Sequence, residues 1–288
     1  SVGNYKKAEA LYDKCIRIEP ENKYFKFSQI NILYKLKEWK RTIDKTMEVL
    51  TTDSIPLLYS LAGDCYWQIE KNDSAVRYYK KTLALAPEDY NTTFKLAKIY
   101  LQTQRYNEMI SCTNDYISID STNKTINQYN GIGYCFVQEF EKAIDRLSKL
   151  YNDGDKSFTT NYFLGASYFG IQDYYPAYEH LTEAYDVDST NLNLLYYLGR
   201  SAILSGKFQK GTAALQKGLE VMTPKDSVLY NYHSTLALDY SRWSKHQEAI
   251  QHYEACLKLK PEIKMTMYSI ASIYDYSLKN QKQALKYY

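Results

Sequence analysis

Turn-forming residues are scarce in this sequence, which contains 11 glycines and 6 prolines among 288 residues, roughly half their usual combined share. A long β-sandwich or barrel needs more turn residues, so the composition favours a mostly helical chain. Long apolar runs are also missing. The longest uncharged stretch, 157–172, includes serine, threonine, asparagine and glutamine, and it is too short and too polar to span a bilayer.

Cysteine and histidine patterns that bind metals are missing as well. The five cysteines lie far apart without a C-x-x-C pair, which argues against a disulfide framework and a zinc site. We interpret them as buried structural thiols. Among the four histidines, His246 and His252 are spaced i, i+6 and would point to different sides of a helix. We therefore expect exposed polar positions there.

No enzyme motif is present. The chain has no phosphate-binding loop of the G-x-x-x-x-G-K-[ST] type, and Gly131-Ile132-Gly133 lacks the third glycine of a dinucleotide loop. The sequence predicts a protein that is not an enzyme and that takes no cofactor and no metal.

The charge is close to balanced, with a net value of +3, but it is unevenly distributed. Residues 122–189 carry 5 basic and 10 acidic side chains. An acidic middle between basic ends argues against a continuous phosphate-binding groove. We expect no nucleic-acid partner, and this pattern disfavours an RNA-binding helical repeat.

The strongest signal is an internal repeat of 34 residues. Small residues recur at that spacing, and tyrosine stands three positions after four of them. A second series of mostly small residues has the same phase. The three series are Gly63, Ala97, Gly131, Gly165, Gly199; Tyr66, Tyr100, Tyr134, Tyr168; and Ala75, Met109, Ala143, Ala177, Gly211. A fixed period of this length is typical of solenoid proteins.

The phase slips twice near the C-terminal end. The step from Gly211 to Ala249 is longer than the period by four positions, and the step from Ala249 to Ala284 is longer by one. We assign the four extra residues to the stretch 221–227 and the single extra residue to 278–281, because both stretches are polar joints where insertions are tolerated.

Each repeat reads as a helix, a short turn and a second helix. Glycine inside a helix costs about 1 kcal/mol relative to alanine, so its recurrence needs a reason. Close approach of the second helix at that point is the simplest reason. Such a hairpin cannot bury its apolar face alone, and stacking on its neighbours buries it. The expected fold is an all-α solenoid.

This pattern resembles the tetratricopeptide repeat family. The matching features are the Leu164-Gly165 pair with Tyr168 and Ala177, and the second-helix residues Ala75, Tyr79 and Pro87, repeated as Ala249, Tyr253 and Pro261. The resemblance implies a right-handed superhelix that forms a single domain over 1–288. The expected partial repeats are 1–21 and 264–288, and the expected full repeats are 22–55, 56–89, 90–123, 124–157, 158–191, 192–229 and 230–263.

Both ends of the pattern lack the polar capping helix that terminal repeats of solenoids usually carry. We therefore expect either a fragment of a longer protein or a homo-oligomer whose uncapped ends cover each other. The lysine, asparagine and tyrosine content resembles that of bacterial proteins from AT-rich genomes, in the cytoplasm or the periplasm.

The resemblance also implies that the first helices line a concave groove. Relative to each small residue, the offsets −6, −3, +1 and +4 form one stripe along the first helix. This stripe mixes aromatic side chains with isolated polar groups, which suits a peptide or protein segment. The candidate groove residues are Tyr24, Phe27, Asn31, Tyr34, Asp64, Trp67, Phe94, Lys98, Gln128, Tyr162, Phe169, Tyr196 and Arg200.

The expected function is a non-enzymatic scaffold that binds a protein or peptide in this groove. Two alternatives stay open: the rings pack on one another and the groove is empty, or the chain is the sensory or assembly region of a larger regulator, such as a signalling protein or transcription factor. Some family members bind acidic C-termini of chaperones through a Lys/Asn/Arg clamp. Here the equivalent residues are Asn31, Asp64 and Lys98, and the aspartate disfavours that function.

Overall fold

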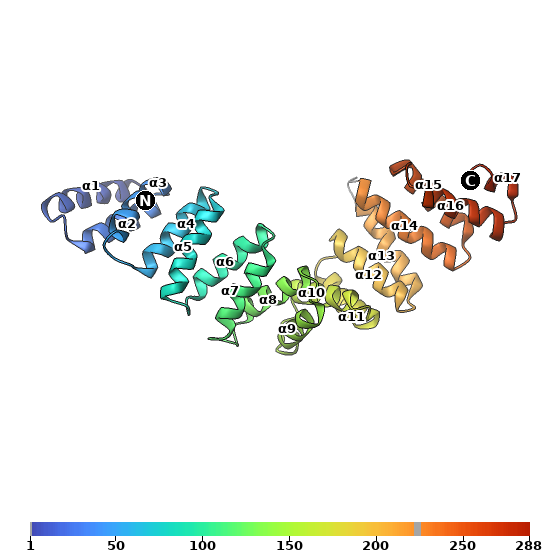
Figure 1. The fold of residues 1–288 in the computed structure, drawn as a ribbon, viewed down its shortest axis with the longest axis horizontal. Helices are drawn as coiled ribbons and strands as arrows, with labels where there is room; N and C mark the ends of the chain where they lie inside the picture. The colour runs from blue at the N-terminus through green and yellow to red at the C-terminus, as the bar shows by residue number, and fades with distance from the viewer. Residues whose placement is uncertain (1, 222–225) are drawn as a thin grey trace. The chain divides into compact units, whose positions relative to one another are not determined.

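The computed structural model describes residues 2–221 and 226–288, and within these ranges all regular structure is helical (Figure 1). The expected all-α fold is confirmed. Contacts divide the chain into two compact parts, the N-terminal part Ser1–Val137 and the C-terminal part Gln138–Tyr288. The single domain over 1–288 stays a prediction.

Helices follow one another with short joints in both parts. The N-terminal part contains α1 (Val2–Ile18), α2 (Lys23–Lys35), α3 (Trp39–Leu50), α4 (Pro56–Gln68), α5 (Asn72–Leu85), α6 (Tyr90–Gln102), α7 (Tyr106–Ile117) and α8 (Lys124–Phe136). The C-terminal part contains α9 (Phe140–Asn152), α10 (Phe158–Gly170), α11 (Tyr174–Val187), α12 (Leu192–Leu204), α13 (Phe208–Val221), α14 (Asp226–Arg242), α15 (His246–Leu259), α16 (Lys264–Ser272), the π-helix η1 (Ile273–Ser277) and α17 (Gln281–Ala284).

The even-numbered helices are the first helices of the repeats, and several of them begin at a polar N-cap. Each capping side chain accepts a hydrogen bond from a backbone N–H in the first turn, which satisfies a donor that the helix itself leaves unpaired. The caps of α2, α6, α8, α10 and α12 are Asn22, Asp89, Asn123, Ser157 and Asn191. The last four recur with the period of the repeat, so the local capping chemistry follows it.

The turn between the two helices of a repeat has a left-handed residue at a fixed place. Glu70 has a φ of 59°, and its N–H and that of Lys71 donate to the carbonyls of Trp67 and Tyr66, which closes the end of α4. Only one residue of this series is glycine. The series is Lys37, Glu70, Gln104, Gln138, Gln172, Gly206, Ser244 and Lys279.

Close approach of the two helices explains the phased glycines. A Cβ atom added at Gly165 would lie 2.6 Å from Cγ of Leu181. The same atom at Gly199 would lie 2.6 Å from Cγ of Leu215. In both cases the obstructing leucine lies on the second helix of the same repeat, at the same place in that helix. The predicted reason for the glycines is confirmed at these positions.

The single extra residue near the C-terminal end lies earlier than expected. The N–H of Leu278 donates to the carbonyl of Ile273 at 3.0 Å, an i→i−5 bond that belongs to η1. A π-helical turn holds one more residue than an α-helical turn, so the insertion is absorbed inside the helix and not in the joint 278–281. Of the other proposed insertion, 221–227, residues 222–225 lie outside the described residues.

First helices of neighbouring repeats also meet one another. In the N-terminal part α6 contacts α8, and in the C-terminal part α10 contacts α12, which contacts α14. Each part therefore carries a layer of first helices, and side chains on that layer from consecutive repeats come within reach of one another.

The histidines are not the exposed polar residues that we expected. Nδ1 of His252 on α15 lies 2.9 Å from Nδ1 of His233 on α14, and its ring stacks on Tyr240. Burial lowers the pKa of both histidines, and the neighbouring His233 helps to lower that of His252 to about 4. The pair is therefore neutral at physiological pH.

This pair predicts a loss of stability in mild acid. The unfolded chain binds protons at these histidines as the pH falls through about 6.5, whereas in the folded chain burial keeps them neutral to a lower pH. The contribution of the neutral pair to the free energy of unfolding is therefore complete above about pH 6.5 and is lost as the pH falls toward 4. The free energy of unfolding should fall by about 1–2 kcal/mol between pH 7 and pH 5. Denaturant titrations of wild type and His252→Gln measure it. The variant should show a flatter pH dependence than wild type, and equal slopes for His252→Gln and wild type would contradict the assignment.

Candidate functional site

All candidate groove residues lie on first helices. In the N-terminal part they fall on α2, α4, α6 and α8, and in the C-terminal part on α10 and α12. Tyr24 and Asn31 are exposed, and the other candidates are half-buried. The two parts differ in what surrounds these side chains.

An apolar groove runs between α2 and α4. It has a volume of about 340 Å³, and three candidate residues line it. Its side chains come from α2, from α4 and from the joint that precedes α4. We define the α2–α4 groove by Tyr24, Phe27, Ser28, Ile30, Asn31, Ile55, Leu57, Leu58 and Leu61. Two large apolar side chains on it are open to solvent: Tyr24 is 67% exposed and Leu57 is 75% exposed.

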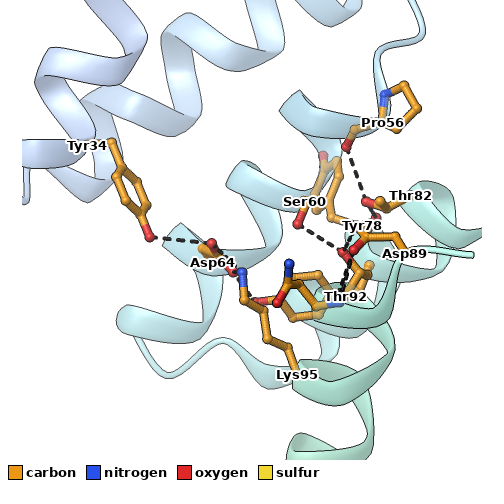
Figure 2. A network of polar contacts seen from close by, with 11 residues as sticks. Tyr34, Pro56, Ser60, Asp64, Tyr78, Thr82, Asp89, Thr92 and Lys95 are labelled. Atoms are coloured by element: carbon orange, nitrogen blue, oxygen red, sulfur yellow. Dashed lines mark hydrogen bonds and ion pairs between the residues drawn. The ribbon is translucent and has the colours of Figure 1, made fainter. Parts of the chain in front are cut away.

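A polar cluster centred on Asp64 lies on the same layer of first helices (Figure 2). The Asp64 carboxylate accepts hydrogen bonds from Oη of Tyr34 at 3.3 Å and from Oη of Tyr79 at 2.6 Å. Nζ of Lys95 lies 2.7 Å from Oδ1 and 2.8 Å from Oδ2 of the same carboxylate. Burial, together with the Asp64 charge, raises the pKa of Tyr34 to about 12 and that of Tyr79 further still. The cluster thus links α2, α4, α5 and α6.

Other contacts tie α6 to α4. Nζ of Lys98 lies 5.3 Å from the ring centre of Trp67, a cation–π distance. The hydroxyls of Ser60 and Thr92 are 3.0 Å apart. Figure 2 shows this pair beside Asp89, the N-cap of α6, whose carboxylate accepts from the Thr92 hydroxyl at 2.7 Å. The structure therefore brings Trp67 and Lys98 together, as well as Tyr34 and Asp64.

The candidate rings of the C-terminal part pack among other aromatic side chains. Tyr162 and Phe169 both contact Tyr197, at 6.4 and 5.3 Å between ring centres. Tyr196 contacts Tyr232, at 5.5 Å. All these rings lie against the apolar core. Burial raises the pKa of Asp239, and the nearby positive charge of Arg200 partly offsets this rise. In the C-terminal part, the candidate residues therefore pack against neighbouring side chains of this chain.

The sequence stripe missed the residues two positions before each small residue. Lys95 reaches back to Asp64, Tyr129 packs on Phe94 at 5.6 Å, and Tyr197 packs on the candidate rings of α10. In the α2–α4 groove the residue at this offset is Leu61, which forms part of the wall. The side chain at offset −2 thus packs against the first helix of the preceding repeat. This position recurs with the period of the repeat, so a second stripe drawn through it in the sequence would have included these residues.

Within residues 2–221 and 226–288, no group of three or more His, Cys, Asp or Glu side chains lies together in a way that could hold a metal ion. No disulfide joins the five cysteines, all of which lie in the described part of the chain; Cys65 and Cys256 are buried and the other three are half-buried. No helix in the described part of the chain is long and apolar enough to cross a membrane.

Comparison with known sequences identifies the repeat. Family models described as tetratricopeptide repeat match residues 61–108, and also 1–22 and 231–263. A tetratricopeptide repeat protein 21 homolog of Caenorhabditis briggsae is 26% identical over 115 residues, which are 38% of this chain and 8% of that protein. The Caenorhabditis elegans homolog is 25% identical over 101 residues, again 8% of its length. The chain thus matches only a small fraction of these curated relatives.

Solved structures agree on the fold. The C-terminal part of a repeat-containing protein from Cytophaga hutchinsonii matches with a TM-score of 0.63 at 16% identity, covering 84% of this chain and 98% of that one. YrrB, described as a tetratricopeptide repeat protein with an unusual peptide-binding site, matches with a TM-score of 0.56 at 14% identity, covering 66% and 96%. MamA matches with a TM-score of 0.52 at 22% identity, covering 58% and 91%. Together with the phased repeat and the stacked helix pairs, these matches show that the chain contains tetratricopeptide repeats and has their solenoid fold.

Proposed function

We propose that this chain is a non-enzymatic interaction scaffold that holds a peptide segment in the α2–α4 groove. Its repeats and its fold neighbours support a protein-interaction scaffold. The observation that carries the finer proposal is the groove itself, because it keeps two large apolar side chains in solvent beside a concave apolar wall. Contiguous apolar patches that are exposed to solvent often mark interaction sites, whereas single exposed apolar side chains do not.

The groove favours a partner with an apolar anchor. Its wall consists mainly of aliphatic and aromatic side chains, with the amide of Asn31 as a polar group that can orient a backbone. Cations on the neighbouring helix are already engaged, since Lys95 binds Asp64 and Lys98 lies over Trp67. A clamp for a terminal carboxylate finds no support in this arrangement. A leucine- or phenylalanine-containing segment fits the groove better.

YrrB provides a parallel within the same fold, because its description names a peptide-binding site. The likeness is one of fold, at 14% identity, and carries no residue across. It supports the idea that a stack of these repeats can hold a peptide, while the position of the site on this chain rests on the groove.

Peptides selected for binding from a random displayed library would test this function. We expect binders enriched in large apolar residues and an affinity loss of about ten-fold or more, roughly 1.4 kcal/mol, in the double variant Tyr24→Ala/Leu57→Ser. The folded state should tolerate these changes, because both side chains are mostly exposed. Fluorescence anisotropy measures the affinity, and a thermal melt checks the fold.

A matched control is available at the other end of the chain. Tyr276 and Leu285 are 67% and 75% exposed, the same values as the two groove residues. The variant Tyr276→Ala/Leu285→Ser should bind the selected peptides like wild type. If both double variants lose affinity equally, or if neither does, the groove is not the binding site.

A further inference from the structure

Two histidine rings join the first and second helices of one repeat in the C-terminal part. Nδ1 of His233 on α14 lies 2.9 Å from Nδ1 of His252 on α15, and both rings are half-buried. At this separation one ring donates an N–H and the other accepts it with a lone pair. The bond between the two helices therefore depends on how many protons the rings carry.

The pair takes up one additional proton without losing this bond, but not a second. The first proton goes to the outer Nε2 of the donor ring, which still donates its Nδ1–H. The second has to go to the accepting Nδ1, because that ring already carries a proton on Nε2. Two N–H groups and two positive charges then face each other, and the attraction becomes repulsion.

The groups packed around the pair do not balance this repulsion. Burial lowers the pKa of both rings, and the neighbouring His233 helps to lower that of His252 to about 4. Tyr240 of α14 stacks on His252, and its hydroxyl oxygen accepts from Nε2 of Gln216 on α13 at 2.9 Å. Burial raises the pKa of Tyr240, and the carboxylate of Glu248 on α15 adds to that rise. Tyr240 therefore stays neutral in this pH range.

Asp239 on α14 responds to acid in the opposite sense. Burial raises its pKa, although the charges of Arg200 on α12 and Arg242 partly offset the rise. A group whose pKa is raised by folding binds its proton more readily in the folded chain, so acid stabilises α14 through Asp239. The contact of α16 with α14 joins the hydroxyls of Tyr230 and Thr266, 3.3 Å apart, and neither titrates in this range. An opening of this helix pair in acid has to come from the histidines.

We propose that His233 and His252 form an acid-sensitive switch. The switch holds α14 against α15 while the pair carries at most one additional proton, and it releases the two helices when both rings are protonated. The release is local to this repeat, because the bond that breaks lies between its own first and second helices.

A buried thiol reports on the release. Cys256 lies one turn after His252 on the same face of α15. The side chain is fully buried, and Sγ lies 3.7 Å from the carbonyl oxygen of Tyr230 on α14. Separation of the two helices therefore exposes Cys256. Cys65 is buried to the same extent in the N-terminal part and serves as the reference within the same chain.

Pulsed labelling of the folded whole chain with dithiodipyridine at pH 7 and pH 5 tests the switch, with peptide mass spectrometry as the readout. Burial raises the pKa of both thiols, so acid lowers both thiolate concentrations alike, and the labelling ratio of Cys256 to Cys65 cancels this effect. We expect the ratio to rise about ten-fold between pH 7 and pH 5 in wild type.

Two variants remove the switch. His252→Gln and His233→Gln each place an amide beside the remaining ring, and an amide donates or accepts as that ring requires without taking up a proton. The ratio should change less than about two-fold with pH in both variants. No rise in wild type, or a rise that both variants retain, would overturn the proposal.

His180→Gln is the matched control. His180 is another half-buried histidine of the C-terminal part, and burial lowers its pKa, but its Nδ1 lies 3.0 Å from the amide oxygen of Asn161 and not beside a second histidine. This variant should keep the wild-type rise. If it flattens the ratio as much as His252→Gln does, the whole C-terminal part opens in acid, and the local switch is wrong.

Discussion

Replacing Gly165 by leucine is expected to lower the free energy of unfolding by about 1–3 kcal/mol or more, the usual cost of overpacking a well-packed core. The first added atom would already lie 2.6 Å from Cγ of Leu181 and 3.1 Å from the carbonyl oxygen of Ala177. The second contact is with backbone, which cannot rotate away. Helices α10 and α11 would have to separate, and the core of the C-terminal part would lose contacts around Leu181.

Denaturant unfolding of a graded series measures this effect. Gly165→Ala should cost less than Gly165→Leu, because it adds one methyl group in place of a branched side chain. Gly3→Leu is the control, since Gly3 also lies in a helix but has nothing within 4 Å of an added Cβ. A cost at Gly165 no larger than that at Gly3 would show that the helices do not approach closely there.

The helix pairs could be predicted because their signals are local and repeated. Apolar spacing, glycines at helix crossings and the phase of the repeat are all properties of neighbouring residues, and each repeat restates them. The left-handed turn residues could not be predicted, because no single residue type recurs at their place in the repeat. The described turns of this series place glutamine, lysine, glutamate or serine where glycine is preferred, and only Gly206 carries the expected residue type.

The stripe of candidate residues on the first helices does not distinguish positions that line a groove from positions that pack against neighbouring rings. Phe27 and Tyr162 occupy the same offset of −3 in their repeats, counted from Ile30 and Gly165, yet Phe27 lines a groove and Tyr162 packs on Tyr197. The difference comes from the next repeat, whose side chain at offset −2 is Leu61 in the first case and Tyr197 in the second. Whether a site is open thus depends on pairs of residues in consecutive repeats, which a single helical stripe does not contain.

Replacing Asp64 by alanine is expected to lower the free energy of unfolding by about 2–4 kcal/mol. The change removes one carboxylate but leaves three donors behind. Oη of Tyr79 is the most costly of these, because Tyr79 is fully buried and its bond to Asp64 is 2.6 Å long. Lys95 loses the carboxylate that balances its charge in a half-buried position. Since the cluster joins α2, α4, α5 and α6, its loss should loosen the layer that supports the α2–α4 groove.

Asp73→Ala separates this effect from a simple change in net charge. The Asp73 side chain is 98% exposed, and its ion pair with Arg105 at 3.2 Å lies at the surface, where such pairs contribute at most about 1 kcal/mol. Denaturant unfolding of the two variants should differ by at least about 1 kcal/mol. Asp64→Asn should fall between them, because an amide oxygen still accepts from Tyr79 while the charge that balances Lys95 is gone. If Asp64→Ala lowers the free energy of unfolding no more than Asp73→Ala does, the cluster does not stabilise the fold. The geometry of the groove must then rest on apolar packing between α2 and α4 alone.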